Sequence, residues 1–189
     1  MRRRSWTGRT GGGDNPEPPD PAKLRSAARN TAIGLLARRE HAQAEIKRKL
    51  RDRGYDKDLT LGVVDDLTRQ RLLSDTRFAE AFIRSRAERG QGPVRLKAEL
   101  RQLQIPAEQI ERQLLAAEVN WADLACAVRL RKFGSRPANR LSERAKQVRF
   151  LQYRGFTAAQ IRAAMGTRCE DDLLETGDDG DPPVFDSET

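Results

Sequence analysis

The amino-acid sequence predicts an all-α fold built from three tandem three-helix units of the helix-turn-helix kind. Three observations point to it: one pattern recurs about every 50 residues, helix-breaking residues divide the chain at regular intervals, and strand-forming residues are scarce. Aromatic residues make up 5% of the chain and charged residues 34%, whereas a sheet protein normally needs more aromatic and β-branched residues. This composition suits small helical units that each bury one apolar stripe.

The repeat consists of a leucine, a helix-ending residue four positions later and an apolar residue directly after it. In chain order these triplets are Leu50, Gly54 and Tyr55; Leu100, Gln104 and Ile105; and Leu151, Gly155 and Phe156. Glycine ends a helix well because it adopts the left-handed conformation without a steric clash. The turn of the second copy must hold Gln104 in that conformation or take another geometry.

Each copy of the repeat predicts a tight pair of helices, and the longer helix before the pair supplies the third member of the unit. Its apolar stripe should face the pair. The expected stripe residues are Ile33 and Leu36 in the first unit, Phe78, Phe82 and Ile83 in the second, and Leu124, Ala125 and Val128 in the third.

Helix breakers divide the chain into nine helical segments, with boundaries uncertain by about 2–4 residues. The segments cover residues 21–39, 42–53, 57–71, 75–89, 93–103, 107–117, 121–132, 142–154 and 157–165. Residues expected to cap helices at their N-termini are Asp20, Ser74, Asn120, Ser142 and Thr157. Pro21 suits the first position of a helix.

These segments divide the chain into five parts. They are an N-terminal arm at 1–20, three-helix units at 21–73, 74–119 and 120–166, and a C-terminal tail at 167–189. The arm is rich in glycine, proline and polar residues and the tail is acidic, so we expect both to be disordered.

Charge is unevenly distributed along the chain. The formal net charge is +8, but residues 166–189 carry −8 and residues 1–20 carry +1, which leaves +15 for residues 21–165. A body this basic predicts contact with a polyanion or with an acidic protein surface.

The candidate partner-binding and DNA-binding residues are the basic side chains of the three units. They are Lys47, Arg48 and Arg51 in the first, Arg84, Arg86, Arg89, Arg95, Lys97 and Arg101 in the second, and Arg129, Arg131, Lys132, Arg140, Arg144, Lys146, Arg149 and Arg154 in the third. Arginine suits this task because its guanidinium can engage two oxygens of a phosphate or carboxylate. About half the set should be structural or merely solvated. In particular, we expect Arg77 and Arg86 to pair with Asp75, Glu80 or Glu88.

The residues indicate no catalytic site, metal site or cofactor, so we expect a binding protein and not an enzyme. The Gly-rich segment TGGGDN lacks the strand, helix and lysine of a phosphate-binding loop. Asp65 and Asp66 point about 100° apart on a helix, and no histidine or third acid is placed to join them. Cys126 and Cys169 have no CxxC spacing, which predicts reduced thiols in the cytoplasm. No apolar run reaches about 18 residues, so no membrane span is expected.

The segments LLARREHAQAEIKRKLRDRGY, LLSDTRFAEAFIRSRAERGQGP and RFLQYRGF, the last followed by IRAAM, resemble the RecX family of recombination regulators. The resemblance extends over about residues 22–166 and implies three three-helix repeats in an elongated, curved array. It also implies binding to RecA recombinase and to RecA filaments on single-stranded DNA. The implied effect is inhibition of ATP hydrolysis and strand exchange in recombination, DNA repair and the SOS response. In one departure, Ala42 replaces the serine that begins an S-x-x-E capping box, which should weaken that helix start by about 1 kcal/mol.

The repeats leave a second function open, which is direct and largely non-sequence-specific DNA binding by helix-turn-helix-like units. The third helices, around residues 109–115 and 160–165, are short and carry few of the side chains that read base edges. We therefore favour a protein-directed regulator that is monomeric and binds DNA weakly and in a salt-dependent way.

Deleting residues 168–189 should raise the affinity of the protein for DNA, because a tail with a net charge of −8 competes with DNA for the basic units. Titration of a labelled oligonucleotide at low salt measures the effect. An unchanged dissociation constant would rule out this role of the tail.

Overall fold

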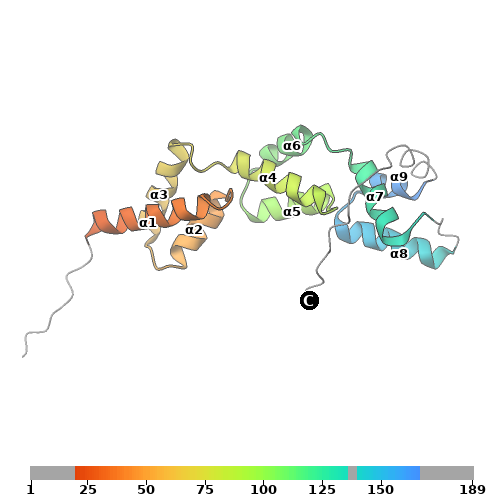
Figure 1. Ribbon diagram of the computed structural model, residues 1–189, viewed down its shortest axis with the longest axis horizontal. Helices are drawn as coiled ribbons and strands as arrows, with labels where there is room; N and C mark the ends of the chain where they lie inside the picture. The colour runs from red at the N-terminus through yellow and green to blue at the C-terminus, as the bar shows by residue number, and fades with distance from the viewer. Residues whose placement is uncertain (1–19, 136–139, 167–189) are drawn as a thin grey trace, which may run out of the picture.

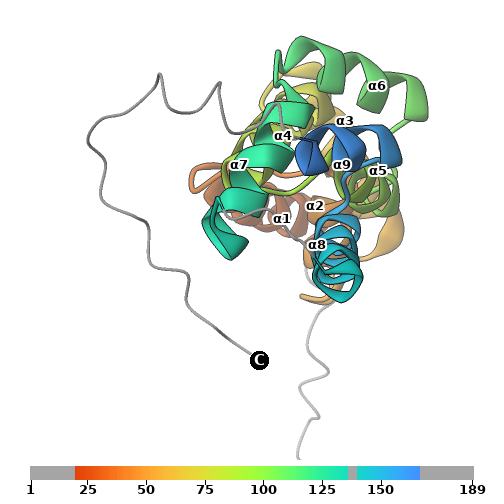
Figure 2. The same cartoon turned by 90° about the vertical axis from the view of Figure 1, so that its right-hand side faces the viewer.

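The computed structural model describes residues 20–135 and 140–166, and all regular structure in these ranges is α-helical. Within this described part of the chain, nine helices form three groups that follow one another along an elongated molecule (Figure 1). Viewed along its length, the third group stands in front of the other two (Figure 2). The predicted all-α fold of three three-helix units is confirmed. The acidic tail, and the arm except Asp20, lie outside the described residues.

The first unit packs α1 (Pro21–Leu36), α2 (Gln43–Arg51) and α3 (Lys57–Arg69) against one another. Its buried core consists of Ala28, Ala32, Ile46, Leu50, Val63, Val64, Leu67 and Leu73. Leu36 packs against this core as predicted, but Ile33 is 37% exposed, so its predicted core position is wrong. Ala28 and Ala32, one helical turn apart, occupy the inner face of α1 instead.

The second unit contains α4 (Asp75–Glu88), α5 (Pro93–Gln102) and α6 (Ala107–Ala116). Its buried core consists of Ala42, Phe78, Ala79, Ile83, Leu96, Leu100, Ile105, Ile110 and Leu114. The turn between α5 and α6 holds Gln104 at φ 61°, the left-handed conformation that glycine adopts in the other two copies. The repeat geometry is therefore kept without its glycine, at the steric cost of a non-glycine residue there.

The third unit contains α7 (Trp121–Phe133), α8 (Leu141–Arg154) and α9 (Ala158–Met165). Its buried core consists of Ala125, Cys126, Val128, Leu151, Phe156, Ile161 and Ala164. The predicted cap at Ser142 is wrong, because α8 already begins at Leu141 with Arg140 as its N-cap residue. Cys126 is buried in this core, and Cys169, the other cysteine of the chain, lies outside the described residues. In the described parts of the chain, no helix combines the length and apolar character needed to cross a membrane.

Backbone hydrogen bonds join the second unit directly to the third. The Gly92 amide donates to the Arg154 carbonyl at 2.8 Å, and the Val94 amide donates to the Gly155 carbonyl at 3.0 Å. A Cβ atom on Gly92 would lie 2.4 Å from the Gly155 carbonyl oxygen. The start of α5 and the end of α8 therefore meet at a distance that only glycine permits at position 92.

Side-chain contacts, and not backbone hydrogen bonds between the units, connect the first unit to the second. Ala42, fully buried, lies in the core of the second unit although it precedes α2 of the first. The Gln43 amide, at the start of α2, donates to Asp75 Oδ1 at 2.8 Å, so the second unit supplies a cap that Ala42 cannot. Arg77 donates from Nε to Glu40 Oε1 at 2.7 Å, and its partner is thus not one of the three acids predicted.

Glu45 organises the connection that precedes α2. Its carboxylate accepts hydrogen bonds from Arg39 Nη2 at 3.1 Å and from the Ala42 amide at 3.4 Å, and it lies 3.1 Å from His41 Nδ1. Burial raises the pKa of Glu45, but Arg39 and His41 outweigh it, so the pKa lies below its ordinary value. The carboxylate is therefore ionised at neutral pH and holds the connection in place.

Gly92→Ala should lower the free energy of unfolding by about 1–3 kcal/mol, because the added methyl group forces the two units apart. Gly34→Ala is the matched control, since a Cβ there meets no atom within 4 Å and alanine favours the helix. Denaturant unfolding of the full chain compares the two variants. Equal stability of both would show that the close contact contributes nothing.

Candidate functional site

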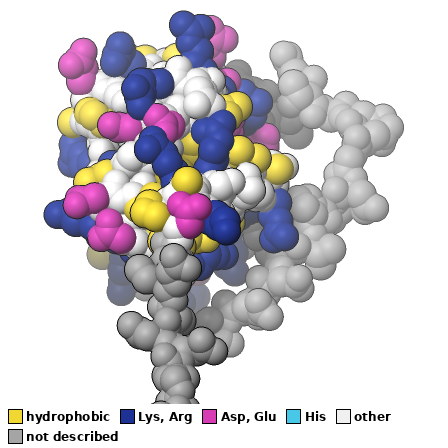
Figure 3. All heavy atoms as spheres, turned by 90° about the vertical axis from the view of Figure 1, so that its left-hand side faces the viewer, with side chains coloured by type: hydrophobic (Ala, Val, Ile, Leu, Met, Phe, Trp, Pro, Cys, Tyr) yellow, Lys and Arg dark blue, Asp and Glu magenta, His cyan; other side chains and the backbone are white. Residues whose placement is uncertain are grey.

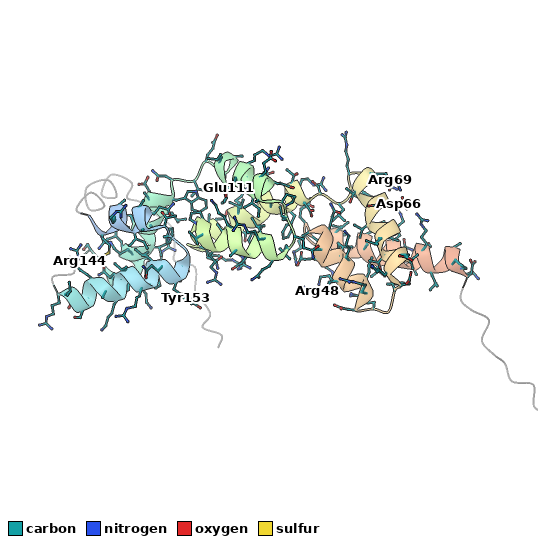
Figure 4. All side chains as sticks on the ribbon, turned by 180° about the vertical axis from the view of Figure 1, so that it is seen from behind. Arg48, Asp66, Arg69, Glu111, Arg144 and Tyr153 are labelled. Carbon is teal, nitrogen blue, oxygen red and sulfur yellow. The ribbon has the colours of Figure 1, made fainter. Side chains whose placement is uncertain are left out.

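The second helices of the three units, α2, α5 and α8, lie along one edge of the molecule (Figure 1). The end of α8 meets the start of α5 through the Gly92 contacts, and Gln104 after α5 lines the same groove as Gln43 of α2. Figure 4 shows Arg48 and Tyr153 on this edge, whereas Arg69 and Glu111 lie on the opposite side. We call the exposed residues of α2, α5 and α8 the second-helix edge.

The third unit contributes cations without carboxylate partners. Its exposed basic residues are Arg131, Lys132, Arg140, Arg144, Lys146, Arg149 and Arg162. Asp123 and Glu143 are the only acidic residues between positions 120 and 166. No ion pair in the described residues involves any of these cations. Their charge is therefore available to an external anion.

The first unit presents its cations in a similar way on α2. Lys47, Arg48 and Arg51 are half-buried or exposed, and no carboxylate of the described chain pairs with them. The far end of this unit differs, because Lys and Arg stand among Asp and Glu there (Figure 3). Asp66 at that end bonds to both Arg25 and Arg69. α2 therefore carries four cations that form no ion pair among the described residues, namely Lys47, Arg48, Lys49 and Arg51.

The second unit uses most of its predicted binding residues internally. The ion pairs are Arg84–Glu80 at 2.8 Å, Arg86–Glu99 at 3.6 Å, Arg95–Glu99 at 2.8 Å and Lys97–Glu111 at 2.7 Å. Arg89 and Arg101 are exposed and have no such partner among the described residues. The pairing of Arg86 with Glu99 differs from the predicted partners. The middle of the second-helix edge is therefore less positive than its two ends.

Two of the predicted binding residues are not fully exposed, since Arg129 is buried and Arg154 is half-buried. Arg129 is 4% exposed on α7, and its Nε has no hydrogen-bond partner among the described residues. Arg154 donates to the Arg89 carbonyl at 2.9 Å and stands over the Phe150 ring at 5.2 Å. Burial lowers the pKa of Arg154, and the charges of neighbouring arginines act in the same direction. The Arg154 side chain therefore joins the end of α8 to the second unit.

The charge pattern of the sequence did not predict two features of the surface. Tyr153 is 78% exposed on α8, in the i+4 and i+7 positions relative to Arg149 and Lys146, a spacing that the sequence itself contains. A groove of about 820 Å³ lies between the first two units, with Phe78 and Phe82 among its apolar residues. This groove has no sequence signal, because residues from three helices and the connections next to them line it.

Comparison with known proteins assigns each unit separately. Family models for the first, second and third three-helix domains of RecX match residues 28–67, 74–114 and 119–165. The regulatory protein RecX of Halorhodospira halophila (strain DSM 244 / SL1) is 50% identical over 147 residues, which cover 77% of this chain and 91% of that protein. That of Pseudomonas putida KT2440 is 44% identical over 147 residues, with 77% and 94% covered.

Solved structures share the same fold. The crystal structure of RecX from Lactobacillus salivarius superposes with a TM-score of 0.65 at 19% identity and covers 76% of this chain and 96% of that one. A crystal structure of a regulatory protein RecX gives a TM-score of 0.65 at 20% identity, with 75% and 71% covered. With all three units matched in order, the chain belongs to the RecX family of regulatory proteins.

Proposed function

We propose that this protein binds a RecA-type recombinase assembled as a filament on single-stranded DNA and lowers its ATP hydrolysis and strand exchange. Membership of a family of regulatory proteins supports this function. The observation that carries it is the row of three similar units, held in line by close junctions and with unpaired cations on α2 and α8. A filament repeats the same surface, so linked units gain from binding several positions at once.

Protein contacts supply the main affinity in this proposal, and DNA contacts are secondary. The third helices expose acidic residues in two units, namely Asp58 and Asp65 on α3 and Glu108 and Glu111 on α6. Carboxylates repel the phosphates that flank a DNA groove, so α3 and α6 are poor recognition helices. The unpaired cations of α2 and α8 are better placed to meet phosphates or acidic protein surface. We expect the protein to act as a cytoplasmic monomer, without cofactor and without catalysis of its own.

Adding this protein to a RecA filament that hydrolyses ATP on single-stranded DNA should inhibit hydrolysis at fewer than one molecule per filament subunit. The double charge reversal Arg144→Glu with Arg149→Glu should weaken inhibition, because neither side chain has a carboxylate partner among the described residues. Arg84→Glu is the control, because Arg84 is already paired with Glu80. This variant should inhibit hydrolysis more strongly than the double variant and almost as strongly as the wild type. Unchanged hydrolysis and strand exchange at equimolar protein would refute the proposed function.

The affinity for naked single-stranded DNA should fall steeply with salt, and Lys146→Gln with Arg149→Gln should make the dependence shallower. Each lost phosphate contact reduces the slope of log K against log salt by about 0.7, so the double variant should lose about 1.4. Arg84→Gln should leave the slope unchanged because Glu80 already neutralises that charge. Anisotropy titrations over a salt series measure the slopes; equal slopes for all three proteins would exclude phosphate contacts by α8.

A further inference from the structure

We propose that Tyr153, with Lys146 and Arg149, forms a binding site for single-stranded nucleic acid, in which a base stacks on the tyrosine ring and the two cations meet phosphates. The site lies on the third-unit end of the second-helix edge. It rests on the secondary DNA contact of the proposed function and deepens it by naming the groups that would hold a strand in the absence of a recombinase.

Tyr153 is a large aromatic side chain that lies outside the core of its unit. It is 78% exposed, and the core of the third unit is complete without it. The other tyrosine of the chain, Tyr55, packs against the core of the first unit. Exposed aromatic rings in a basic setting are the platforms on which proteins stack unpaired bases.

The two cations stand on the same face of α8 as the ring. Positions 146, 149 and 153 follow the i, i+3, i+7 spacing, so they form one stripe along the helix. Helical rise places Arg149 about 6 Å and Lys146 about 10 Å from Tyr153 along the axis. Both side chains are exposed and have no carboxylate partner within the described residues. A strand with a base on the ring can therefore place its phosphates against them.

The junction between units fixes the ring from one side. Arg95 of α5 holds its guanidinium carbon 5.8 Å from the centre of the Tyr153 ring, and Glu99 fixes Arg95 through a 2.8 Å bond. The neighbouring Gly155 lies so close to α5 that a Cβ there would be 2.4 Å from Arg95 Cβ. A ring with a cation on one side and 78% of the residue exposed keeps its other side open for stacking.

These features select unpaired strands over other anions. A duplex buries the faces of its bases, so it can offer phosphates to Arg149 but no base to Tyr153. An acidic protein surface could pair with Lys146 and Arg149, but its carboxylates would make no use of the exposed Tyr153 ring. The combination of both groups in one stripe thus fits a single strand best.

The test uses the full-length protein and labelled oligonucleotides in anisotropy titrations. The probes are oligo-dT, oligo-U, an abasic oligomer of equal length and a duplex. Tyr153→Ala should weaken oligo-dT binding about 5- to 150-fold, which corresponds to about 1–3 kcal/mol for one stacked base. Tyr153→Phe should bind like the wild type, because phenylalanine keeps the ring. Leu115→Ala, at an 81% exposed residue of α6, is the control and should change nothing.

The abasic oligomer and the duplex should bind Tyr153→Ala and the wild type equally, since neither offers a base to the ring. Comparison of the dissociation constants for oligo-dT and oligo-U shows whether the site prefers DNA or RNA. Unchanged oligo-dT affinity of a folded Tyr153→Ala protein would overturn the proposal, as would an equal loss on the abasic oligomer. Loss of recombinase inhibition with intact oligo-dT binding would also overturn it and assign Tyr153 to a protein contact. The titrations contain no recombinase, so they test this site separately from the proposed inhibition of a recombinase.

Discussion

The close backbone contact between the second and third units is the constraint on which the arrangement of the molecule depends. Two amides at the start of α5 donate to the last carbonyls of α8, which are helix-end acceptors that α8 itself cannot satisfy. The contact needs the small residues Gly92 and Gly155, since a side chain on either would clash with the opposite backbone. It aligns two second helices into one edge and brings Arg95 beside Tyr153, residues that are far apart in sequence.

The distribution of internal ion pairs divides the same edge into regions of different character. The second unit pairs half of its cations with its own carboxylates, for example Lys97 with Glu111, and it carries the junctions on both sides. The first and third units keep their cations free on α2 and α8. The exposed ion pairs of the second unit add little to the stability of the fold, so their main effect is to remove positive charge from the middle of the second-helix edge.

Local signals in the sequence were sufficient for most of the fold. The leucine–turn–apolar repeat predicted all three helix pairs, and capping residues such as Asn120 and Thr157 predicted helix starts correctly. Predictions that depend on tertiary packing were wrong. Ile33 has the spacing of a core residue, yet alanines allow α1 to pack closer on another face. Arg77 lies near three acids in sequence but pairs with Glu40, which the joint between units brings to it.

The candidate site was predictable as a set of residue types but not as a surface. Composition identified the cations, because charge is additive along a chain and needs no geometry. Whether a cation is free depends on partners from other helices, as with Arg86 and Glu99, and such partners have no fixed spacing in sequence. Tyr153 was overlooked for the same reason, since only the structure shows that a tyrosine next to a core leucine is exposed.

The cap that Asp75 provides for α2 has a consequence for how the protein melts. A helix start that depends on a neighbouring unit cannot stay ordered once that neighbour unravels, because its first amide loses its acceptor. Ala42 adds to this coupling, since it is buried in the hydrophobic core of the following unit. In a linear array, such nearest-neighbour terms add to the intrinsic stability of each repeat. The three units should therefore unfold in a single cooperative transition, with the middle one controlling the order of both ends.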